Sequence, residues 1–396
     1  MDLPSFLRLL ASEGQDALQE AMALQPREED FLSLFTALSR RFPPDLARAA
    51  LETAILRGEA AGKFPFSGQM YFTRQALEQS TAFPVSSYRA ERFRSFRRLV
   101  DAGCSIGGDT LALAPVAPTA GIDIDPLRLA MARANLDSLG LGERAEFLRL
   151  DLNLSLPLAG MPGAALFFDP ARRTGHRRAF SVREYTPPLG VVQGWLPHFP
   201  ALSVKISPGV DLAEIEAYDA EVEFISLGGE LKEAVLWFGP LKSTRRRATV
   251  LPGPHSMQSA SESSPAGSTS QPRRFLFEPD PSILRAGLVT DLGEVLGATQ
   301  LDPEIAYLTA DDHRSSPFTR WWRVEDWFPF SLKRLRTYLR VRSVGQVVVK
   351  KRGSPLQPEA LIHDLRLKGE AERVVFLTQL RGQPVVIVCF KEEPLF

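Results

Sequence analysis

The chain has 396 residues, enough for two or three domains, and its 47 basic and 47 acidic side chains cancel, so only a local basic patch could attract nucleic acid. Its two cysteines lie far apart in the sequence, which excludes a cysteine-based metal cluster and a disulfide framework, and no metal site is predicted. The first residues lack the basic and apolar regions of a signal peptide and no apolar run could span a membrane, so we expect a cytoplasmic protein with no membrane partner.

The first 60 residues are predicted to be helical. Apolar residues recur at helical spacing after Phe6 and after Phe31, and Pro43-Pro44 opens a further helix. We expect residues 1–60 to form a cap that packs on the domain that follows, because amphipathic stripes are usually core faces; a substrate-binding role is the alternative. Residues 61–96 are rich in aromatic and basic side chains and are expected to lead into a ligand pocket.

A strand, a glycine-rich turn and a helix are predicted next. Leu99-Val100 suits a buried parallel strand, and residues 101–110 (DAGCSIGGDT) carry glycines that let the backbone approach a ligand closely. A second strand ends at Asp123, 20 residues after Gly103, about the spacing at which nucleotide-binding folds place an acid on ribose hydroxyls. The turn and the acid together predict a cofactor site.

Two further predicted strands end in acidic residues. Residues 145–150 are followed by Asp151-Leu152, and residues 164–168 are followed by Asp169-Pro170. Strands and helices alternate over residues 97–240, which predicts a doubly wound α/β sheet. The strand ends of such a sheet face the ligand crevice, so we expect these acids to gather there.

Taken together, these features resemble the class I S-adenosylmethionine-dependent methyltransferases. In that family the glycine turn holds the methionine part of the cofactor, the acid after the second strand holds its ribose, and an acid after the third strand lies near the adenine. The resemblance implies an α/β fold: a class I Rossmann-like methyltransferase core with an N-terminal helical cap and a C-terminal small α+β module. The hairpin predicted over residues 221–238 agrees, because these enzymes close their sheet with one whereas dehydrogenases usually do not.

The resemblance implies S-adenosyl-L-methionine as cofactor and assigns roles to residues. The cofactor-binding positions it implies are Asp101, Gly103, Ser105, Gly107, Asp123, Asp151 and Leu152. The catalytic positions it implies, from the D/N-P-P-x motif after the fourth strand, are Asp169, Pro170 and Arg172. Ala171 departs from that motif where enzymes that methylate nucleobase amino groups carry a second proline, and Arg172 stands in place of their aromatic residue. An Asp after a strand is also a common turn former, which leaves Asp151 open.

Methyl transfer at Asp169 is expected to need few catalytic groups. Methyl transfer needs an in-line nucleophile about 3 Å from the methyl group in an oriented pocket, and a carboxylate can orient that nucleophile or accept its proton. The basic residues that follow predict a positive rim that suits an anionic substrate; a solvated basic loop is the alternative. The substrate-binding residues expected there are Arg173, Arg177 and Arg178.

Other segments resemble one bacterial group of these enzymes, which carries a C-terminal THUMP-like domain. The resemblance rests on residues 76–81 (ALEQST) with Tyr88-Arg89-Ala90, on residues 205–209 (KISPG) and on residues 277–280 (FEPD). It extends over most of the chain from about residue 60 onward. It implies an RNA-binding type of module but not a particular substrate.

A hydrolase is the remote alternative. Residues 103–107 also fit G-x-S-x-G, the nucleophile elbow of α/β-hydrolases, which would make Ser105 a nucleophile. No HGGG-like oxyanion segment precedes it, and no histidine follows in an evident strand-end loop of the same sheet. A cysteine adduct is not expected either, because Cys104 lies in the cofactor turn and Cys389 in the terminal module.

The domains expected from these patterns are 1–60 (cap), 61–240 (methyltransferase), 241–274 (disordered linker), 275–312 (a small connecting, ferredoxin-like segment) and 313–396 (THUMP-like module). Residues 314–352 carry eleven basic and two acidic residues, a net charge of +9, and the aromatic residues Trp321, Trp322, Trp327, Phe328, Phe330 and Tyr338 are interleaved with them. This is typical of RNA-binding surfaces, although the tryptophans are expected to belong to the core.

The function expected is therefore methylation of RNA, either tRNA or rRNA. The substrate-binding residues expected in the terminal module are Lys350, Lys351 and Arg352. The alternatives are methylation of a small molecule or a protein, and a catalytically degenerate scaffold that binds RNA. The oligomeric state and the methylated atom are not predicted.

Overall fold

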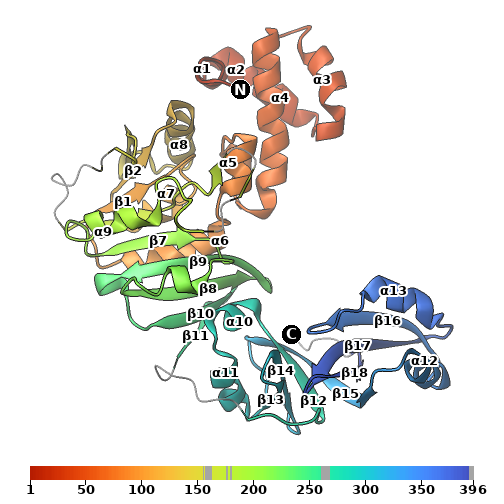
Figure 1. Cartoon of the computed structure of the whole chain (residues 1–396). Helices are drawn as coiled ribbons and strands as arrows, with labels where there is room; N and C mark the ends of the chain where they lie inside the picture. The colour runs from red at the N-terminus through yellow and green to blue at the C-terminus, as the bar shows by residue number, and fades with distance from the viewer. Residues whose placement is uncertain (155, 157–162, 175–176, 179–180, 260–267, 392–396) are drawn as a thin grey trace. The chain divides into compact units, whose positions relative to one another are not determined.

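A computed structural model of the whole chain describes residues 1–154, 156, 163–174, 177–178, 181–259 and 268–391, with the backbone alone for 173–174 and 177–178 (Figure 1). The chain divides into two compact units. The first comprises residues 1–222 and 232–243, and the second comprises residues 223–231 and 244–396. None of the helices in these ranges is both long enough and apolar enough to cross a bilayer.

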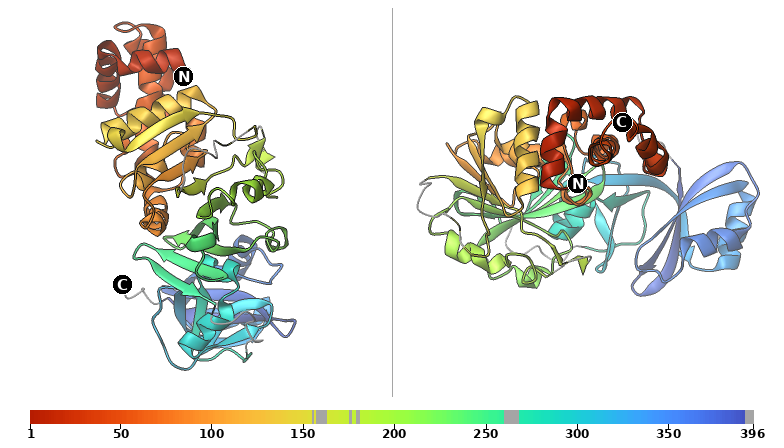
Figure 2. Two further views of the ribbon diagram at one scale, coloured as in Figure 1. Left: turned by 90° about the vertical axis from the view of Figure 1, so that its left-hand side faces the viewer. Right: turned by 90° about the horizontal axis from the view of Figure 1, so that it is seen from above.

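The first unit begins with the predicted helical cap. Its helices are α1 (Leu3–Leu10), α2 (Ser12–Ala23), α3 (Phe31–Leu38) and α4 (Pro44–Glu59). The Asp2 side chain caps α1 by accepting the Ser5 N–H, and a proline opens α4, where no backbone donor is needed. The cap shares one apolar cluster with Met131 and Leu136 of α8 (Pro126–Ser138), against which it packs (Figures 1 and 2).

The core of the first unit is the predicted parallel sheet. Its strands are β1 (Leu99–Ala102), β2 (Thr119–Asp123), β3 (Ala145–Arg149), β4 (Ala165–Phe168), β7 (Leu202–Ile206) and β9 (Glu230–Phe238). They lie in the order β9-β7-β4-β1-β2-β3, with β9 antiparallel to β7 and every other pair parallel. The carboxyl ends of β1, β2, β3, β4 and β7 therefore meet at one edge, as the alternating pattern predicts.

The predicted hairpin is present. Strand β8 (Ala220–Leu227) turns through Gly228 and Gly229 into β9. Both glycines have positive φ, 62° and 80°, which residues with a side chain rarely adopt. The division between the two units falls within this hairpin.

The disordered linker expected over residues 241–274 is wrong in part. Strands β10 (Arg246–Leu251) and β11 (His255–Gln258) form an antiparallel pair within it. Ala248 and Leu251 are buried, and the buried Thr249 hydroxyl donates to Glu223 of β8 over 2.6 Å. The Ser- and Pro-rich stretch beside this short strand dominated the composition and hid it. The central residues of the expected linker, 260–267, lie outside the described residues.

The second unit contains a seven-stranded sheet in the order β13-β14-β12-β15-β18-β17-β16. Its strands are β12 (Phe275–Pro279), β13 (Thr299–Asp302), β14 (Ile305–Ala310), β15 (Thr319–Pro329), β16 (Val344–Lys351), β17 (Ala371–Leu380) and β18 (Gln383–Phe390). The last three correspond to the predicted apolar runs. Because β12 pairs with both β14 and β15, the expected segments 275–312 and 313–396 share one sheet.

Four helices accompany this sheet. They are α10 (Pro281–Ala286), α11 (Val289–Leu296), α12 (Leu332–Val341) and α13 (Pro358–Leu365). Leucines of α12 and α13 form one apolar cluster with β16, β17 and β18, so these two helices cover one face of that end of the sheet (Figure 1). A second cluster includes Tyr307, Phe376 and Trp322. The module is therefore α+β, with apolar packing on both faces of its sheet.

Candidate active site

The glycine turn after β1 adopts a backbone that its sequence requires. Gly103, Ser105 and Gly107 all have positive φ, at 86°, 51° and 80°. A Cβ atom at Gly103 would lie 2.4 Å from the carbonyl oxygen of Asp169, so only glycine allows the two loops to touch. The Asp169 N–H also donates to the Ala102 carbonyl over 3.0 Å. The turn after β1 and the acid after β4 are thus brought together as the sequence predicts.

Asp123 lies at the end of β2 with its carboxylate already oriented. One oxygen accepts the N–H of Ser105 and the other accepts the N–H of Asp125, each over 2.9 Å. Each oxygen can accept at least one more hydrogen bond. This arrangement suits a pair of ribose hydroxyls, which are donors at neighbouring positions.

Asp101 is a fully buried acid beneath the same turn. One of its oxygens accepts the hydroxyl of Thr110, while the other has no hydrogen-bond partner among the described residues. Burial, reinforced by the neighbouring carboxylate of Asp109, raises the pKa of Asp101 to about 8. A buried acceptor without a partner beside a glycine turn fits a ligand that brings a donor or a positive charge.

A buried ion network, which the sequence reasoning missed, lies beside Asp101. Arg89, from α6 (Phe83–Ala90), forms ion pairs with Asp109 and with Glu233 of β9. The Arg89 and Glu233 side chains are each only 2% exposed. Burial alone lowers the pKa of Arg89, but the carboxylates of Glu233 and Asp109 outweigh it and raise that pKa above its ordinary value. Burial raises the pKa of Asp109.

Asp169 forms an ion pair with Lys205, a residue to which the sequence alone assigns no role. The Nζ atom of Lys205, on β7, lies 2.7 Å from Oδ2 of Asp169. Lys205 is 4% exposed and Asp169 is 20% exposed, so the carboxylate is reachable while its partner is not. Pro170 is buried, and the half-buried Arg172 has a buried Nη1 atom with no hydrogen-bond partner among the described residues.

The remaining expected residues of this site divide into two groups. Asp151 accepts both the backbone N–H and the side-chain amide of Asn153 over 2.9 and 2.8 Å, which is the local turn that its sequence also allows. Leu152 follows it and is half-buried. The backbones of Arg173, Arg177 and Arg178 pair in β5 (Arg173–Thr174) and β6 (Arg177–Arg178), and their side chains lie outside the described residues.

The nucleophiles of the alternative chemistries lack activation. Ser105 donates its amide to Asp123, and its hydroxyl has no hydrogen bond to a histidine in the described part of the chain. Cys104 is buried, and burial raises the pKa of its thiol well above the ordinary value. Burial likewise raises the pKa of Cys389. Neither thiol is poised to attack, because the thiolate is the reactive form.

The three expected RNA-binding residues of the terminal module have different surroundings. Lys350 forms an ion pair with Glu278 and lies 4.7 Å from the ring centroid of Trp322. The guanidinium of Arg352 lies 4.9 Å from the ring centroid of Tyr307. Lys351 is exposed and donates to the side chain of Gln357 over 2.9 Å. Only Lys351 is a freely exposed cation of the three.

The residues around the turn fit S-adenosylmethionine. Four carboxyl groups (Asp101, Asp109, Asp169 and Glu233) share this region with two cations (Arg89 and Lys205). The raised pKa of Asp101 keeps that group protonated near neutral pH, and the other three acids still outnumber the two cations. The cofactor carries positive charge on its sulfonium and its ammonium groups. The acceptor without a partner on Asp101 and the oriented carboxylate of Asp123 meet the donors of its methionine and ribose parts.

Two family models match parts of the chain. The THUMP domain-like family matches residues 319–391, and a domain of unknown function, DUF8688, matches residues 2–60. Over 350 residues the chain is 37% identical to proteins of two Mycobacterium tuberculosis strains, CDC 1551/Oshkosh and H37Rv. Each is described as an uncharacterized S-adenosylmethionine-dependent methyltransferase, and the match covers 85% of this chain and 94% of the relative.

One solved structure resembles the chain over almost its full length. It is a crystal structure of a protein from Porphyromonas gingivalis W83 that has been assigned as a methyltransferase. The two folds agree with a TM-score of 0.73 and 22% sequence identity, over 93% of this chain and 100% of that one. The likeness is one of fold, and it includes both units of the molecule.

Proposed function

The chain belongs to the S-adenosylmethionine-dependent methyltransferases, and from this premise we propose that its substrate is an RNA, either tRNA or rRNA. The observation that carries the proposal is the net charge of +9 over residues 314–352 in a chain whose total charge is zero. Most of this segment lies within the THUMP domain-like match. Dense positive charge on one part of a neutral protein favours binding of a polyanion.

The exposure of these basic residues supports the proposal. Eight of the eleven are exposed: Arg314, Arg320, Arg323, Lys333, Arg334, Arg340, Arg342 and Lys351. The interleaved aromatic rings are instead engaged inside the module; Trp322 contacts Phe376 and Trp321 contacts Phe275. Contacts to phosphates, rather than stacking of bases on tryptophan, are therefore expected to dominate the affinity.

In this proposal the residues around the glycine turn bind the cofactor, which supplies an electrophilic methyl group on its sulfonium. Asp123 accepts the ribose hydroxyls through the two oxygens that the backbone amides orient. Asp101, Gly103, Ser105 and Gly107 take the methionine part. The assignment of Asp151 and Leu152 to the adenine rests on their place after β3.

Asp169 is the proposed catalytic residue. Lys205 holds one of its oxygens, which leaves the other to orient the nucleophile or accept its proton. The buried Pro170 helps to exclude water, and the Nη1 atom of Arg172 without a partner is available to an anionic group of the substrate. Arg173, Arg177 and Arg178 are proposed to add positive charge for the RNA backbone.

Mass spectrometry of modified nucleosides tests the proposal directly. RNA from cells with and without the gene is digested, and one methylated nucleoside is expected to be missing without it. The purified protein with labelled S-adenosylmethionine should restore that nucleoside in tRNA or rRNA from the deficient cells. No missing nucleoside, together with transfer of label to a protein or a small molecule, would replace RNA with that substrate.

A catalytically degenerate RNA-binding scaffold is the second candidate, favoured by one observation: Ala171 stands where related nucleobase methyltransferases have a second proline. Calorimetry decides between the two. Binding of S-adenosylmethionine supports the enzyme, whereas no binding up to millimolar concentration, with RNA binding intact, supports the scaffold.

A further inference from the structure

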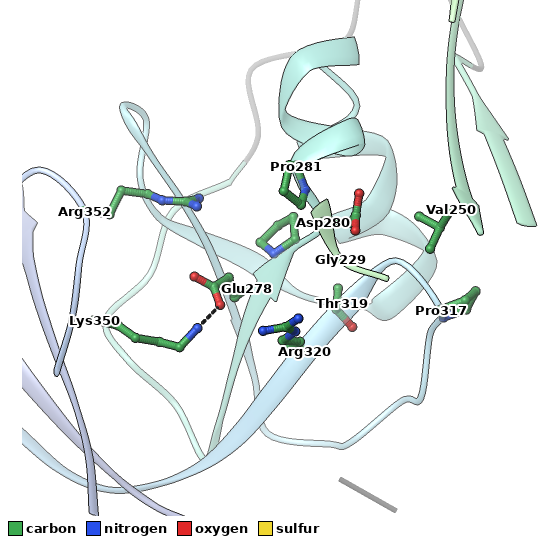
Figure 3. A pocket seen from close by; sticks show the side chains of 11 residues that line it. Gly229, Val250, Glu278, Asp280, Pro281, Pro317, Thr319, Arg320, Lys350 and Arg352 are labelled. Atoms are coloured by element: carbon green, nitrogen blue, oxygen red, sulfur yellow. Dashed lines mark hydrogen bonds and ion pairs between the residues drawn. The ribbon is translucent and has the colours of Figure 1, made fainter. Parts of the chain in front are cut away.

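The second unit contains a pocket of about 380 Å³ that the cofactor site does not use (Figure 3). Its walls come from the β8–β9 turn, β10, β12, the start of α10, β15, and the end of β16 with the residue after it. The residues that matter for its chemistry are Glu278, Asp280, Thr319, Arg320, Lys350 and Arg352. Figure 3 shows Lys350 and Arg352 extending from the same side toward Glu278 and Pro281.

Some of the charged side chains in this pocket have partners within the protein and others do not. Glu278 and Lys350 neutralise each other in an ion pair. Asp280 uses one carboxylate oxygen to cap α10, where it accepts the N–H and the hydroxyl of Ser282 over 2.8 and 2.6 Å. The backbone of Arg320 pairs with β12 in the sheet, but its side chain has no hydrogen bond or ion pair among the described residues. The guanidinium groups of Arg320 and Arg352 are therefore the charges left for a ligand.

Two polar atoms in the walls lack partners as well. Nη1 of Arg352 and Oγ1 of Thr319 are buried, and neither has a hydrogen-bond partner in the described part of the chain. An unsatisfied buried polar atom costs about 1–3 kcal/mol, so it calls for a physical reason. Two such atoms in one pocket, one a cationic donor and one a hydroxyl, are explained if a ligand with acceptor oxygens binds there.

We propose that this pocket binds one unpaired nucleotide of an RNA strand, with its phosphate on Arg320 and Arg352. The volume lies at the lower end of small-ligand sites, which are about 300–1,000 Å³, and suits a nucleotide but not a duplex. Val250 and the prolines of the lining offer apolar walls for a base, and the Thr319 hydroxyl can bond to a sugar or phosphate oxygen. This inference rests on the proposed function and names the part of the RNA that the module recognises.

The test uses the full chain and three probes: a single-stranded oligouridylate, a blunt-ended RNA duplex, and adenosine 5′-monophosphate. The pocket variant is Arg320→Gln with Arg352→Gln. The matched control is Lys368→Gln with Arg381→Gln, which removes two exposed cations of the same unit that lie outside residues 314–352 and do not line the pocket. Fluorescence anisotropy and calorimetry measure binding, and circular dichroism checks that each variant is folded.

The pocket variant should weaken oligouridylate binding about tenfold and lower the log–log salt slope by about one, while the control changes the affinity less than threefold. The two variants should affect duplex binding equally. Equal losses of oligouridylate affinity in both variants would overturn the pocket assignment and leave the RNA proposal intact. Loss of adenosine monophosphate binding alone, with oligouridylate unaffected, would also overturn it and identify a free nucleotide as the ligand.

A second variant separates binding from folding. Thr319→Val keeps the shape of the side chain and removes a hydroxyl that has no partner, so the melting temperature should stay equal or rise while oligouridylate binding falls severalfold. A lower melting temperature with unchanged binding would contradict the proposal. If the mass-spectrometric test finds no RNA product but the pocket variant still loses oligouridylate selectively, the proposed function fails and the pocket assignment stands.

Discussion

The two units of this protein use charge in opposite ways. Around the glycine turn of the first unit, Arg89, Glu233 and Lys205 are between 2% and 4% exposed, and each has a partner of opposite sign. In residues 314–352 of the second unit, most basic residues are exposed and two acids are far too few to neutralise them. Buried pairs are weakly screened by salt, whereas exposed charges are strongly screened. The first arrangement suits a small ligand held in one geometry, and the second suits a long polyanion.

Asp169→Asn should have the largest effect on turnover. The substitution keeps the shape of the side chain and removes the charge that orients the nucleophile, so the turnover rate should fall about 10²- to 10⁴-fold. Binding of S-adenosylmethionine, measured by calorimetry, should change little. The exposed Asp16→Asn on α2 is the matched control and should leave both quantities unchanged. If Asp169→Asn lost cofactor affinity as much as Asp123→Ala, the division of roles would be wrong.

Arg89→Met should have the largest effect on stability. It leaves Glu233 and Asp109 buried without their cation, and breaking a buried pair from one side costs about 3–5 kcal/mol of unfolding free energy. Arg334→Met, at an exposed arginine of α12, should cost under about 1 kcal/mol. Urea unfolding measures both variants. Equal losses of unfolding free energy in the two variants would contradict the proposed difference between buried charges in the first unit and exposed charges in the second.

Asp123→Ala should weaken binding of S-adenosylmethionine by about 1–3 kcal/mol, the usual loss for a hydrogen bond to a charged group. Calorimetry measures the change. Turnover at saturating cofactor should be much less affected than in Asp169→Asn. Unchanged cofactor affinity would remove Asp123 from the proposed site.

Asp101 predicts a pH effect that the second unit should not show. Its pKa of about 8 lies above the ordinary 3.8, so the folded protein keeps a proton that the unfolded chain has released. The stability of the wild type should therefore fall as the pH rises from about 4 to about 8, by up to about 1.4 kcal/mol per unit from this group. Asp101→Asn lacks this titration. The free energy of unfolding of the variant minus that of the wild type, measured with urea, should therefore increase between pH 5 and pH 8. A difference in unfolding free energy that does not change with pH would contradict the raised pKa of Asp101.

The smallest effect concerns salt. Each RNA phosphate contacted should add about 0.7–0.9 to the log–log slope of affinity against salt, while cofactor binding should depend on salt only weakly. Charge reversal of Lys350, Lys351 and Arg352 together should lower the slope and leave cofactor binding unchanged. Filter binding of tRNA over a salt series measures the slope. An identical slope would show that these residues do not contact RNA.

Local patterns in the sequence predicted the parts of the fold that depend on neighbouring residues. Gly103 and Gly107 stand where the turn needs positive φ, and the alternation around Gly228-Gly229 predicted the hairpin. The ends of β2 and β4 followed from short apolar runs that stop at an acid. Patterns of this kind involve only a few neighbouring residues, so they predict local structure without knowledge of the tertiary structure.

The parts that could not be predicted depend on contacts between distant residues. The partners Arg89 and Glu233 are 144 positions apart, and nothing in either segment indicates that its charge is buried. Lys205 opens one of the segments that carry the family resemblance, but its contact with Asp169 depends on the pairing of β4 with β7. Strand β10 was missed because its short apolar run lies between basic and Ser-rich residues.

The ion pair between Arg89 and Glu233 also has a consequence for synthesis of the chain. Arg89 can meet Asp109 as soon as the first strand and turn have left the ribosome, but Glu233 emerges 144 residues later than Arg89. Until then β7 lacks its antiparallel neighbour β9, and the Arg89 guanidinium lacks one of its two buried anions. The nascent methyltransferase domain is therefore expected to mature only after β9 has been translated. Any shortened version that ends before residue 233 should remain a substrate for chaperones and proteases rather than a folded enzyme.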